Sequence, residues 1–285
     1  MSEKKAQELL ECADKKAQQK GWFSGPKYDE AGELYEQASI QFKLAKQLRE
    51  AGEAMLKAAE MSLKQDDYND ASQRFVSASK SFKIAYPEQA VYSLKRAVDL
   101  LTTHNRFYTA ASHQAEIAKI YEKASDTENA MDAYAKAAEW YAQEDSNALA
   151  SKYKLMVATL AAQLQKYEPA IEIFESTAES SIDNPLAKWS IKDYFFKAAL
   201  CRLAIPDDVG AAEALERYKD LDPGFSNTRE CKFLDEIIED IKRADIQAFT
   251  DHTASYDQIS QLDEWKTSLL LRIKRQISEA DDDLL

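Results

Sequence analysis

The sequence predicts an all-α protein that is built from repeated pairs of antiparallel helices. The chain of 285 residues contains only 6 Gly and 6 Pro, whereas all-β sandwiches and barrels need many turns of these two residues. An apolar stripe with helical spacing recurs about every 20 residues along much of the chain. Hydrophobic residues make up 45% of the chain, which excludes a disordered protein because such a chain lacks the apolar area that offsets the entropy of ordering.

The recurring stripe alternates alanine with aromatic residues. It runs from Tyr28 through Ala31, Tyr35 and Ala38, and the same offsets return from Tyr68. A small residue opens a groove into which a ring of the neighbouring helix packs, so consecutive helices can lie close and antiparallel. We expect helices to begin near residues 28, 48, 68, 87, 107, 127, 147 and 167. One helix pair then repeats about every 40 residues, which predicts a tetratricopeptide-like right-handed superhelix.

Residues that break and cap helices lie between the stripes. Asp66-Asp67 and Ser125-Asp126 place side-chain oxygens where the first amides of a helix need acceptors. Pro87 suits a first helical turn, where no amide donor is needed. These residues support the expected helix starts.

The pattern changes after residue 184, where Asn184-Pro185 and Asp222-Pro223-Gly224 separate helices of a different kind. A last stripe from Ile259 through Trp265 to Ile277 predicts one long closing helix. Such helices are expected to cap the open end of the repeats. The expected organisation is a helical-hairpin solenoid over residues 1–184 with a hydrophobic loop near 21–26, a C-terminal helical bundle over 185–278, and an acidic flexible tail over 279–285.

The composition narrows the compartment and the partners. The chain has 37 Lys and Arg against 50 Asp and Glu, a net charge of −13, so phosphate backbones repel it and no nucleic-acid partner is expected. No apolar run is long enough for a membrane span, and the N-terminal residues lack the apolar core of a secretory signal. Three separated cysteines, Cys12, Cys201 and Cys231, predict reduced and buried thiols in the cytoplasm.

Residue patterns for catalysis are missing from the sequence. It has no common motif for nucleotide binding, nucleophilic catalysis or metal-dependent hydrolysis. His113 and Glu116 share a helix face, but no second such pair completes a two-metal site. We therefore expect no enzyme, no cofactor and no metal.

Three surface features remain as candidates for binding. Trp22 and Phe23 lie between Gly and Pro residues and either pack onto the first helix pair or form an exposed loop; two buried rings are worth about 3–5 kcal/mol, so one loop would hold a membrane weakly. The acidic end, 281–285, is either a frayed terminus or a DxxLL sorting signal, and the missing membrane span disfavours the signal. Cations near helix ends form either ordinary solvated charges or a binding face: Arg106, Lys152, Lys154, Lys192 and Arg229.

Four segments carry a resemblance to a known family: Trp189–Cys201 (WSIKDYFFKAALC), Ser226–Lys232 (SNTRECK), Leu262–Lys266 (LDEWK) and Asp281–Leu285 (DDDLL). In these segments, and over nearly the whole chain, the sequence resembles the soluble NSF attachment proteins, most closely the alpha-type members and their fungal versions. The resemblance implies an adaptor that hydrolyses nothing. Such proteins wrap the SNARE four-helix bundle and present it to the hexameric ATPase NSF (N-ethylmaleimide-sensitive factor), which unwinds the bundle for another round of membrane fusion.

The resemblance also assigns the basic face. The family's SNARE-facing cations fall on Arg106, Lys152, Lys192 and Arg229, while a further family lysine corresponds to Ser112, for which Lys154 can partly compensate. SNARE bundle surfaces are largely acidic, and the Debye length is about 8 Å at physiological salt. Local cations therefore outweigh the distant negative charge of the chain.

The other implied contacts are with the membrane and with NSF. The family's hydrophobic loop matches Trp22 and Phe23, in a shortened version, so a weak peripheral membrane contact is expected. The resemblance also implies a monomer when free and several copies in the assembly. Acidic residues and terminal leucines are the candidates for binding and stimulating NSF: Asp207, Asp208, Glu239, Asp281, Asp282, Asp283, Leu284 and Leu285.

Two other classes of function remain as alternatives. A generic tetratricopeptide-like scaffold would bind a peptide or a helical partner without NSF. An all-helical enzyme would need a catalytic pocket, for which the sequence provides no evident residues.

Overall fold

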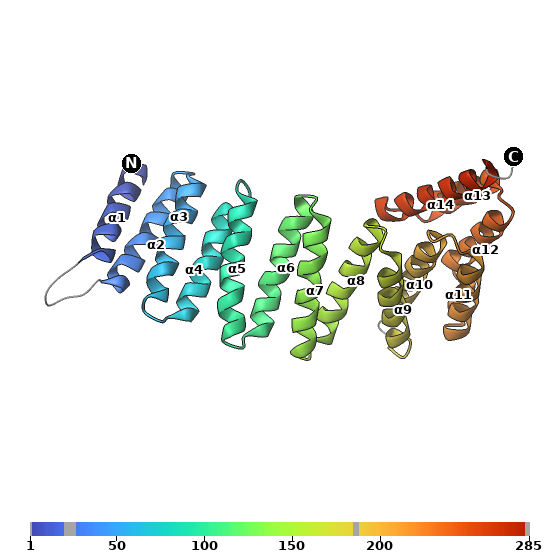
Figure 1. Cartoon of the computed structure of the whole chain (residues 1–285), viewed down its shortest axis with the longest axis horizontal. Helices are drawn as coiled ribbons and strands as arrows, with labels where there is room; N and C mark the ends of the chain where they lie inside the picture. Colours follow the sequence, from blue (N-terminus) through green and yellow to red (C-terminus); the bar gives the residue numbers. More distant parts are fainter. Residues whose placement is uncertain (1, 20–26, 185–187, 283–285) are drawn as a thin grey trace. The chain divides into compact units, whose positions relative to one another are not determined.

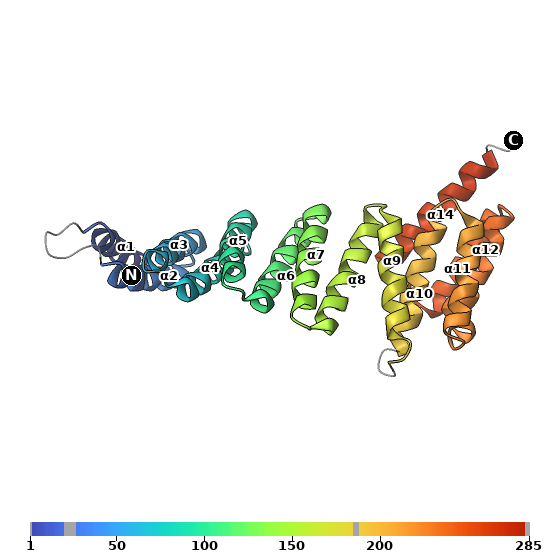
Figure 2. The same ribbon diagram turned by 60° about the horizontal axis from the view of Figure 1, so that its bottom comes forward.

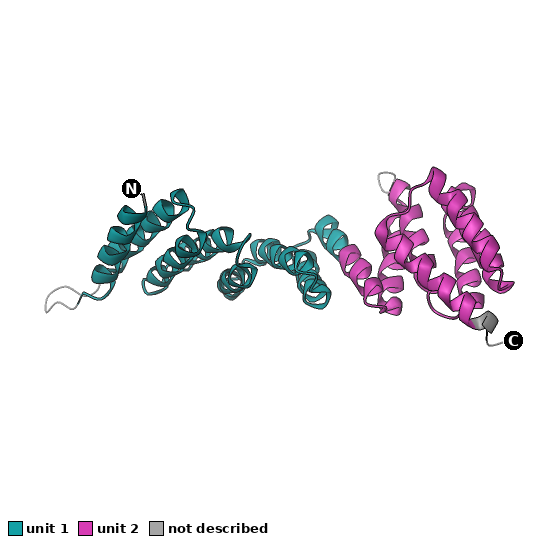
Figure 3. Ribbon diagram, turned by 90° about the horizontal axis from the view of Figure 1, so that it is seen from above, with its two compact units in different colours: residues 1–153 teal, residues 154–285 magenta. Residues whose placement is uncertain are grey.

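The computed structural model describes residues 2–19, 27–184 and 188–282. Within these ranges the chain forms fourteen α-helices and one 3-10 helix, and it has no strand, which confirms the predicted all-α class. The helices belong to two compact units, residues 1–153 and 154–285, and the division falls within α8 (Asn147–Gln163) (Figure 3).

Unit 1 is a series of antiparallel helices in which each helix packs against the next along the chain (Figure 1). The predicted starts are confirmed, because α2 to α9 begin at residues 28, 48, 68, 87, 107, 127, 147 and 167. The helices of unit 1 before α8 are α1 (Ser2–Ala17), α2 (Tyr28–Leu44), α3 (Leu48–Leu63), α4 (Tyr68–Phe82), α5 (Pro87–Thr103), α6 (Phe107–Lys123) and α7 (Thr127–Gln143).

The alternation of alanine and aromatic residues forms the interior of unit 1. Ala38 and Ala78 are fully buried, and Phe75 and Tyr134 are each only 1% exposed. The ring of Tyr153 on α8 stacks on that of Tyr134 with centroids 5.6 Å apart. Small side chains thus let the helix backbones approach while the rings fill the space between them.

The turns between these helices share one geometry that the sequence pattern does not reveal. Before α3, Lys46 adopts a left-handed backbone with φ of 60°. Its amide donates to the carbonyl of Lys43, and the amide of Gln47 donates to Phe42, which is the Schellman pattern of helix termination. The same pair of bonds recurs at every left-handed residue among those described: Lys46, Asp66, Asn105, Ser125, Asp145, Gln165 and Ala244.

The residue after each left-handed position then begins the next helix as its N-cap. Asp67 accepts a hydrogen bond from the amide of Asp70, and Asp126 accepts one from Asn129, as the capping prediction required. One short turn therefore ends a helix and caps the following one, which explains the regular spacing of about 20 residues.

Unit 2 contains the end of α8 and the remaining helices. In Figure 2, α9 and α10 lie side by side, and they pack against each other. The remaining elements are α9 (Tyr167–Ser181), α10 (Lys188–Leu203), α11 (Asp208–Leu221), the 3-10 helix η1 (Phe225–Asn227), α12 (Arg229–Lys242), α13 (Ile246–Ile259) and α14 (Glu264–Asp282).

Contacts within unit 2 place the division between the units earlier than residue 184. The indole nitrogen of Trp265 on α14 donates to the carbonyl of Thr159 on α8 at 3.0 Å. Trp265 also meets Phe174 of α9 edge to face. The end of α8 and α9 therefore pack with the C-terminal helices, although their sequence still follows the repeat.

Two expectations for the C-terminal part need correction. The stripe from Ile259 to Ile277 is not one helix, because α13 ends at Ile259 and α14 begins at Glu264. Ile259 is 64% exposed, whereas Trp265 and Ile277 are buried. The backbone of α14 continues to Asp282, so residues 279–282 are helical rather than part of a flexible tail.

The prediction of a cytoplasmic protein used the cysteines and the lack of a membrane-spanning segment, and the structure describes both features. Cys201 and Cys231 are buried free thiols, as expected, but Cys12 is exposed on α1 because it lies off the buried face of that helix. Among the described residues, no helix combines the length and the hydropathy that crossing a bilayer requires.

Candidate partner-binding surfaces

The predicted basic residues of unit 1 are exposed cations that have no anionic partner within the described ranges of the chain. Arg106 is the N-cap residue of α6, and its Nη1 donates to Oδ1 of Asn69 on α4 at 2.7 Å. Lys152 lies on α8, with Nζ 5.4 Å from the ring centroid of Tyr153. Both contacts orient the side chain without neutralising its charge, so both cations remain available to an acidic partner.

Unit 2 brings two of the predicted cations together. Lys192 on α10 forms an ion pair with Glu230 at 2.8 Å, and Glu230 follows Arg229 at the start of α12. Burial raises the pKa of Tyr256, with Glu230 adding to the rise and Arg229 opposing it, to about 12. Lys154, the fifth predicted cation, is exposed on α8.

Further charges surround Lys192. Asp193, the next residue along α10, pairs with Lys197 at 2.9 Å and with Lys266 of α14 at 3.4 Å. The positive charge of this region is therefore already partly balanced by Glu230 and Asp193. Sequence patterns cannot reveal such pairing, because the partners are 38 residues apart for Lys192 and Glu230.

Ser112 takes a role of its own on α6. It is exposed, and its hydroxyl is hydrogen-bonded to Tyr141 of α7. Burial raises the pKa of Tyr141, and the bond to Ser112 partly opposes that rise. The residue at this position thus contributes a polar link between two helices of unit 1 and no charge.

Two of the predicted acidic residues of unit 2, Asp207 and Asp208, line a cavity of about 270 Å³. Asp207 is the N-cap of α11 and accepts a hydrogen bond from the amide of Gly210 at 2.9 Å. Asp207 and Asp208 line the cavity together with Lys242 from the end of α12 and Ile273 of α14. The cavity is lined by apolar side chains and by charged groups of both signs.

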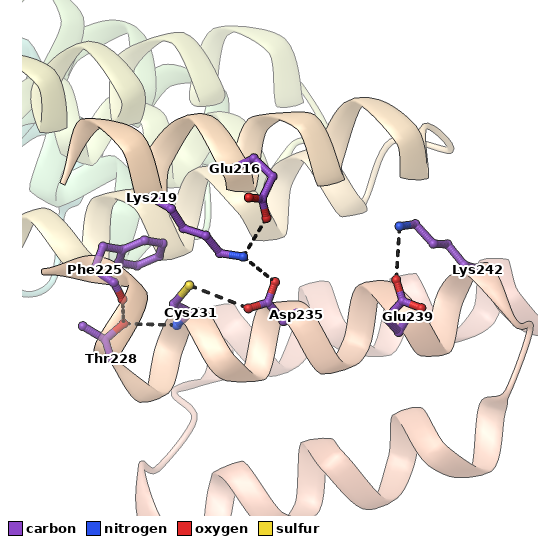
Figure 4. Close-up of polar contacts among 8 residues, drawn as sticks. All are labelled: Glu216, Lys219, Phe225, Thr228, Cys231, Asp235, Glu239 and Lys242. Atoms are coloured by element: carbon purple, nitrogen blue, oxygen red, sulfur yellow. Dashed lines mark hydrogen bonds and ion pairs between the residues drawn. The ribbon is translucent and has the colours of Figure 1, made fainter. Parts of the chain in front are cut away.

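Glu239 lies one turn before the end of α12 and is exposed. Lys242 reaches it at 3.2 Å and Arg243 at 3.6 Å, and Figure 4 shows the contact with Lys242. The two cations that follow this acidic residue in the sequence are therefore its partners. The net negative charge at this end of α12 is smaller than the sequence suggests.

The same close-up shows how α12 is held against α11. Lys219 bridges Glu216 at 2.7 Å and Asp235 at 2.8 Å, and Thr228 caps α12 by accepting the amide of Cys231 (Figure 4). Burial lowers the pKa of Lys219, but the bonds to both carboxylates raise it further, so the ammonium stays charged.

The buried thiols are unsuited to nucleophilic chemistry. Burial raises the pKa of Cys231 to about 11, with Asp235 adding to the rise. Burial likewise raises the pKa of Cys201 to about 12. A thiol that stays protonated at neutral pH is a poor nucleophile, so both cysteines act as packing residues.

The paired residues on α6 are a salt-bridge site. The carboxylate of Glu116 accepts hydrogen bonds from His113 and from Lys83. These bonds, and the one from His113 most strongly, lower the pKa of Glu116 to about 2. Among the described residues no three His, Cys, Asp or Glu side chains are grouped as metal ligands.

Several predicted residues lie outside the part of the chain that the structure describes. Trp22 and Phe23 belong to residues 20–26, and Asp283, Leu284 and Leu285 follow the last described residue. For Asp281 and Asp282 the structure describes the backbone of α14 and not the side chains.

Comparison with protein families decides which protein family this arrangement belongs to. The family model "Soluble NSF attachment protein, SNAP" matches residues 4–278. The chain belongs to this family. Sequence resemblance and family assignment therefore agree over almost the full length.

Two relatives of the soluble NSF attachment protein family illustrate the match. The "Probable vesicular-fusion protein sec17 homolog" of Schizosaccharomyces pombe is 43% identical over 282 residues, which cover 97% of this chain and 98% of the relative. The "Alpha-soluble NSF attachment protein" of Mus musculus is 41% identical over 282 residues, covering 97% and 95%. Neither name gives an enzymatic activity.

Among solved structures, a putative kinesin light chain with TPR-like repeats from Podosopora anserina is 13% identical, with a TM-score of 0.43. The match covers 69% of this chain and 97% of that structure.

Proposed function

We propose that this chain is an adaptor that binds SNARE complexes and recruits and stimulates the NSF ATPase for SNARE disassembly in vesicle fusion. The observation that carries the proposal is the family match over residues 4–278, with relatives named for vesicular fusion and NSF attachment at 43% and 41% identity, respectively. The proposed role is that of a binding protein and not of an enzyme.

The basic residues are the proposed contacts with the SNARE bundle. Arg106 and Lys152 support this role because each is exposed and neither has a carboxylate partner in the part of the chain that the structure describes. Salt screens charges beyond about 8 Å, so these cations act on a bound acidic rod more strongly than the distant charges of a −13 chain do. Lys154 and Arg229 are exposed and extend the same proposal to unit 2.

Lys192 contributes by exchanging partners. In the free protein Glu230 holds it at 2.8 Å, so a carboxylate of the SNARE bundle must replace Glu230 or join it. The side chain of Glu230 is only 16% exposed, so the exchange also has to offset the desolvation of this half-buried pair. Binding through exchangeable pairs tolerates different SNARE sequences and permits release after unwinding.

The acidic residues of unit 2 are the proposed contacts with NSF. Asp207 and Asp208 present carboxylates at the start of α11, and Glu239 is 53% exposed. Asp281, Asp282 and Asp283 would add negative charge, while Leu284 and Leu285 would provide an apolar anchor for stimulation of the ATPase. Trp22 and Phe23 are the proposed weak membrane contact of a cytoplasmic, peripherally associated protein that is a monomer when free and assembles in several copies.

The central experiment measures binding to a preassembled SNARE four-helix bundle and its disassembly by NSF and ATP. The test variant is Arg106→Glu with Lys152→Glu, because neither side chain pairs with an anionic group of the described residues, so the fold loses no ion pair there. The matched control is Lys119→Glu with Lys136→Glu, two exposed lysines that change the net charge equally. The test variant is expected to bind about tenfold more weakly, and the control is expected to bind normally.

Two outcomes would contradict the proposal. If the wild-type chain neither binds the SNARE bundle nor changes the rate of its ATP-dependent disassembly by NSF, the adaptor role is wrong. The alternative function, a scaffold for another helical or peptide partner, would then remain. If test and control variants weaken binding equally, the assigned basic face is wrong. Deleting Leu284 and Leu285 is expected to spare SNARE binding and to remove stimulation of NSF.

A further inference from the structure

Unit 1 contains a groove that the proposed adaptor role does not use. Two adjoining hollows of about 520 Å³ each lie where the α4–α5 turn approaches the α6–α7 turn. Both hollows are lined by Pro87, Ile120 and Ala124. We call this surface the Pro87 groove. Arg106 lies in the turn at the opposite end of α5, so the groove is distinct from the proposed SNARE contact in unit 1.

The rim of the Pro87 groove exposes large apolar side chains. Ile84 is 88% exposed and Tyr92 is 51% exposed, while Val91 and Ile120 form a buried floor between them. Single exposed apolar side chains are common, but large apolar side chains exposed together form a patch that is informative. An exposed apolar rim around a hollow is typical of a surface that binds another molecule.

The groove exists because the α4–α5 turn departs from the others. From α2 to α9 it is the one connection among the described residues without a left-handed residue. Its helix, α5, begins at Pro87, and 87 − 68 = 19 residues separate the starts of α4 and α5, whereas the neighbouring starts are 20 apart. Ile84 lies in this connection and is 88% exposed.

The charges around the groove favour an acidic partner. Lys83, Lys95 and Lys123 line it, against Glu88 and Asp126. The carboxylate of Asp126 is already engaged by the amide and side chain of Asn129 as a helix cap.

The three lysines differ in how much charge they offer. Lys83 pairs with Glu116 at 2.6 Å, and Lys95 lies over the ring of Tyr121 at 5.7 Å from its centroid. Lys123 has no carboxylate partner among the described residues. Two cations without ion pairs therefore face the hollows of a chain whose net charge is −13.

We propose that the Pro87 groove binds an acidic peptide segment of a protein partner that inserts a bulky aliphatic or aromatic side chain into the hollow lined by Ile84 and Lys123. The lysines receive the carboxylates, and Ile84 packs against the inserted side chain, while Tyr92 borders the neighbouring hollow. A recess of this volume suits a side chain better than the surface of a bilayer, which cannot enter it. This inference goes beyond the proposed adaptor role and does not depend on it.

The test uses the full chain and a panel of fluorescein-labelled peptides in which Leu, Ile, Phe or Trp is flanked by Asp and Glu. Binding is measured by fluorescence anisotropy, without SNAREs or NSF. At least one peptide is expected to bind, and replacing its apolar residue by Ser, or its acidic residues by Asn and Gln, is expected to weaken binding at least tenfold.

Variants of the chain locate the site. Ile84→Ser and Lys123→Glu are each expected to weaken peptide binding at least fivefold. The matched controls are Ile259→Ser, the same substitution at another exposed isoleucine in unit 2, and Lys119→Glu on α6; both are expected to bind the peptide normally. Because Ile84 and Lys123 are exposed, these variants retain the fold, which far-ultraviolet circular dichroism checks.

Three results would overturn the inference. No member of the panel binds; the Ile84→Ser and Lys123→Glu variants bind as well as wild type; or vesicles of phosphatidylcholine and phosphatidylserine bind in an Ile84-dependent manner while the peptides do not. Loss of peptide binding in the Arg106→Glu, Lys152→Glu variant would also count against it, since that result would place the peptide on the basic face.

Discussion

Gly52, in the middle of α3, is the position where two opposing effects of one substitution can be compared most directly. Alanine is a better helix former than glycine by about 1 kcal/mol, so Gly52→Ala would stabilise an isolated helix. In the folded protein, however, a Cβ at residue 52 would lie 2.3 Å from the ring of Phe82, with two further ring carbons at 2.4 and 2.6 Å. Ordinary contacts of a Cβ are 3.4–4 Å long, so the ring must move by about 1 Å.

The ring of Phe82 has little freedom to move. It is 1% exposed at the end of α4 and meets Tyr86 edge to face, with centroids 6.3 Å apart. Overpacking of a well-filled interior costs about 1–3 kcal/mol. After subtracting the gain in helix propensity, Gly52→Ala is expected to lower the free energy of unfolding by about 1 kcal/mol and the melting temperature by about 2 °C.

Gly32 on α2 provides the matched control. A Cβ there would lie 2.4 Å from Nη1 of Arg74, the far end of a flexible side chain, and its other neighbours are at 3.5 Å. Arg74 can turn its Nη1 aside at the cost of the hydrogen bond to Ala58, about 1 kcal/mol, which offsets the gain in propensity, while its Nε stays paired with Asp70. Gly32→Ala is therefore expected to melt within about 1 °C of wild type.

The assay is thermal unfolding followed by circular dichroism of the helix signal. A second measurement combines Gly52→Ala with Phe82→Leu, because a smaller side chain removes the clash. The two substitutions are then expected to be coupled by at least about 1 kcal/mol. A Gly52→Ala variant that melts above wild type would refute the close packing of α3 against Phe82.

Three further predictions concern single residues of unit 2. Ala244→Gly is expected to raise the free energy of unfolding by up to about 1 kcal/mol in chemical denaturation, because it relieves a left-handed alanine with φ of 53°; a less stable variant would contradict this. The hydrogen bond from His252 to the buried Asp240 raises the pKa of the imidazole. The stabilisation of the fold by the charged imidazole is therefore complete below its ordinary pKa of about 6.5 and is lost as the pH rises through the raised value. Wild type is thus expected to lose more stability than His252→Gln between about pH 6 and pH 8, and equal losses would refute the assignment. Tyr218→Phe leaves Glu175 without one donor and is expected to cost about 1–2 kcal/mol by urea unfolding, whereas an unchanged midpoint would show that Arg202 and Arg217 satisfy that carboxylate alone.

The candidate surfaces were partly predictable. Family resemblance pointed to Arg106, Lys152 and Lys192, and the structure describes each as a side chain at the protein surface or near it. The ion pairs of Glu239 with Lys242 and Arg243 follow from their i,i+3 and i,i+4 spacing, whereas the pair of Lys192 with Glu230 joins two helices and could not be predicted. Ion pairs depend on which helix faces meet, and a charge in a sequence does not state which face its neighbour presents.

The sequence by itself determined where the repeated helices begin, because the spacing of alanine and aromatic residues and the acidic caps act within a single turn of chain. Only the tertiary structure decided that α8 divides between two units, that Ile259 ends a helix rather than joining α14, and that Ile84 remains exposed. The physical reason is range. Helix periodicity and capping are local, whereas burial and packing depend on residues such as Trp265 and Thr159, which are 106 positions apart in the chain and in contact in the fold.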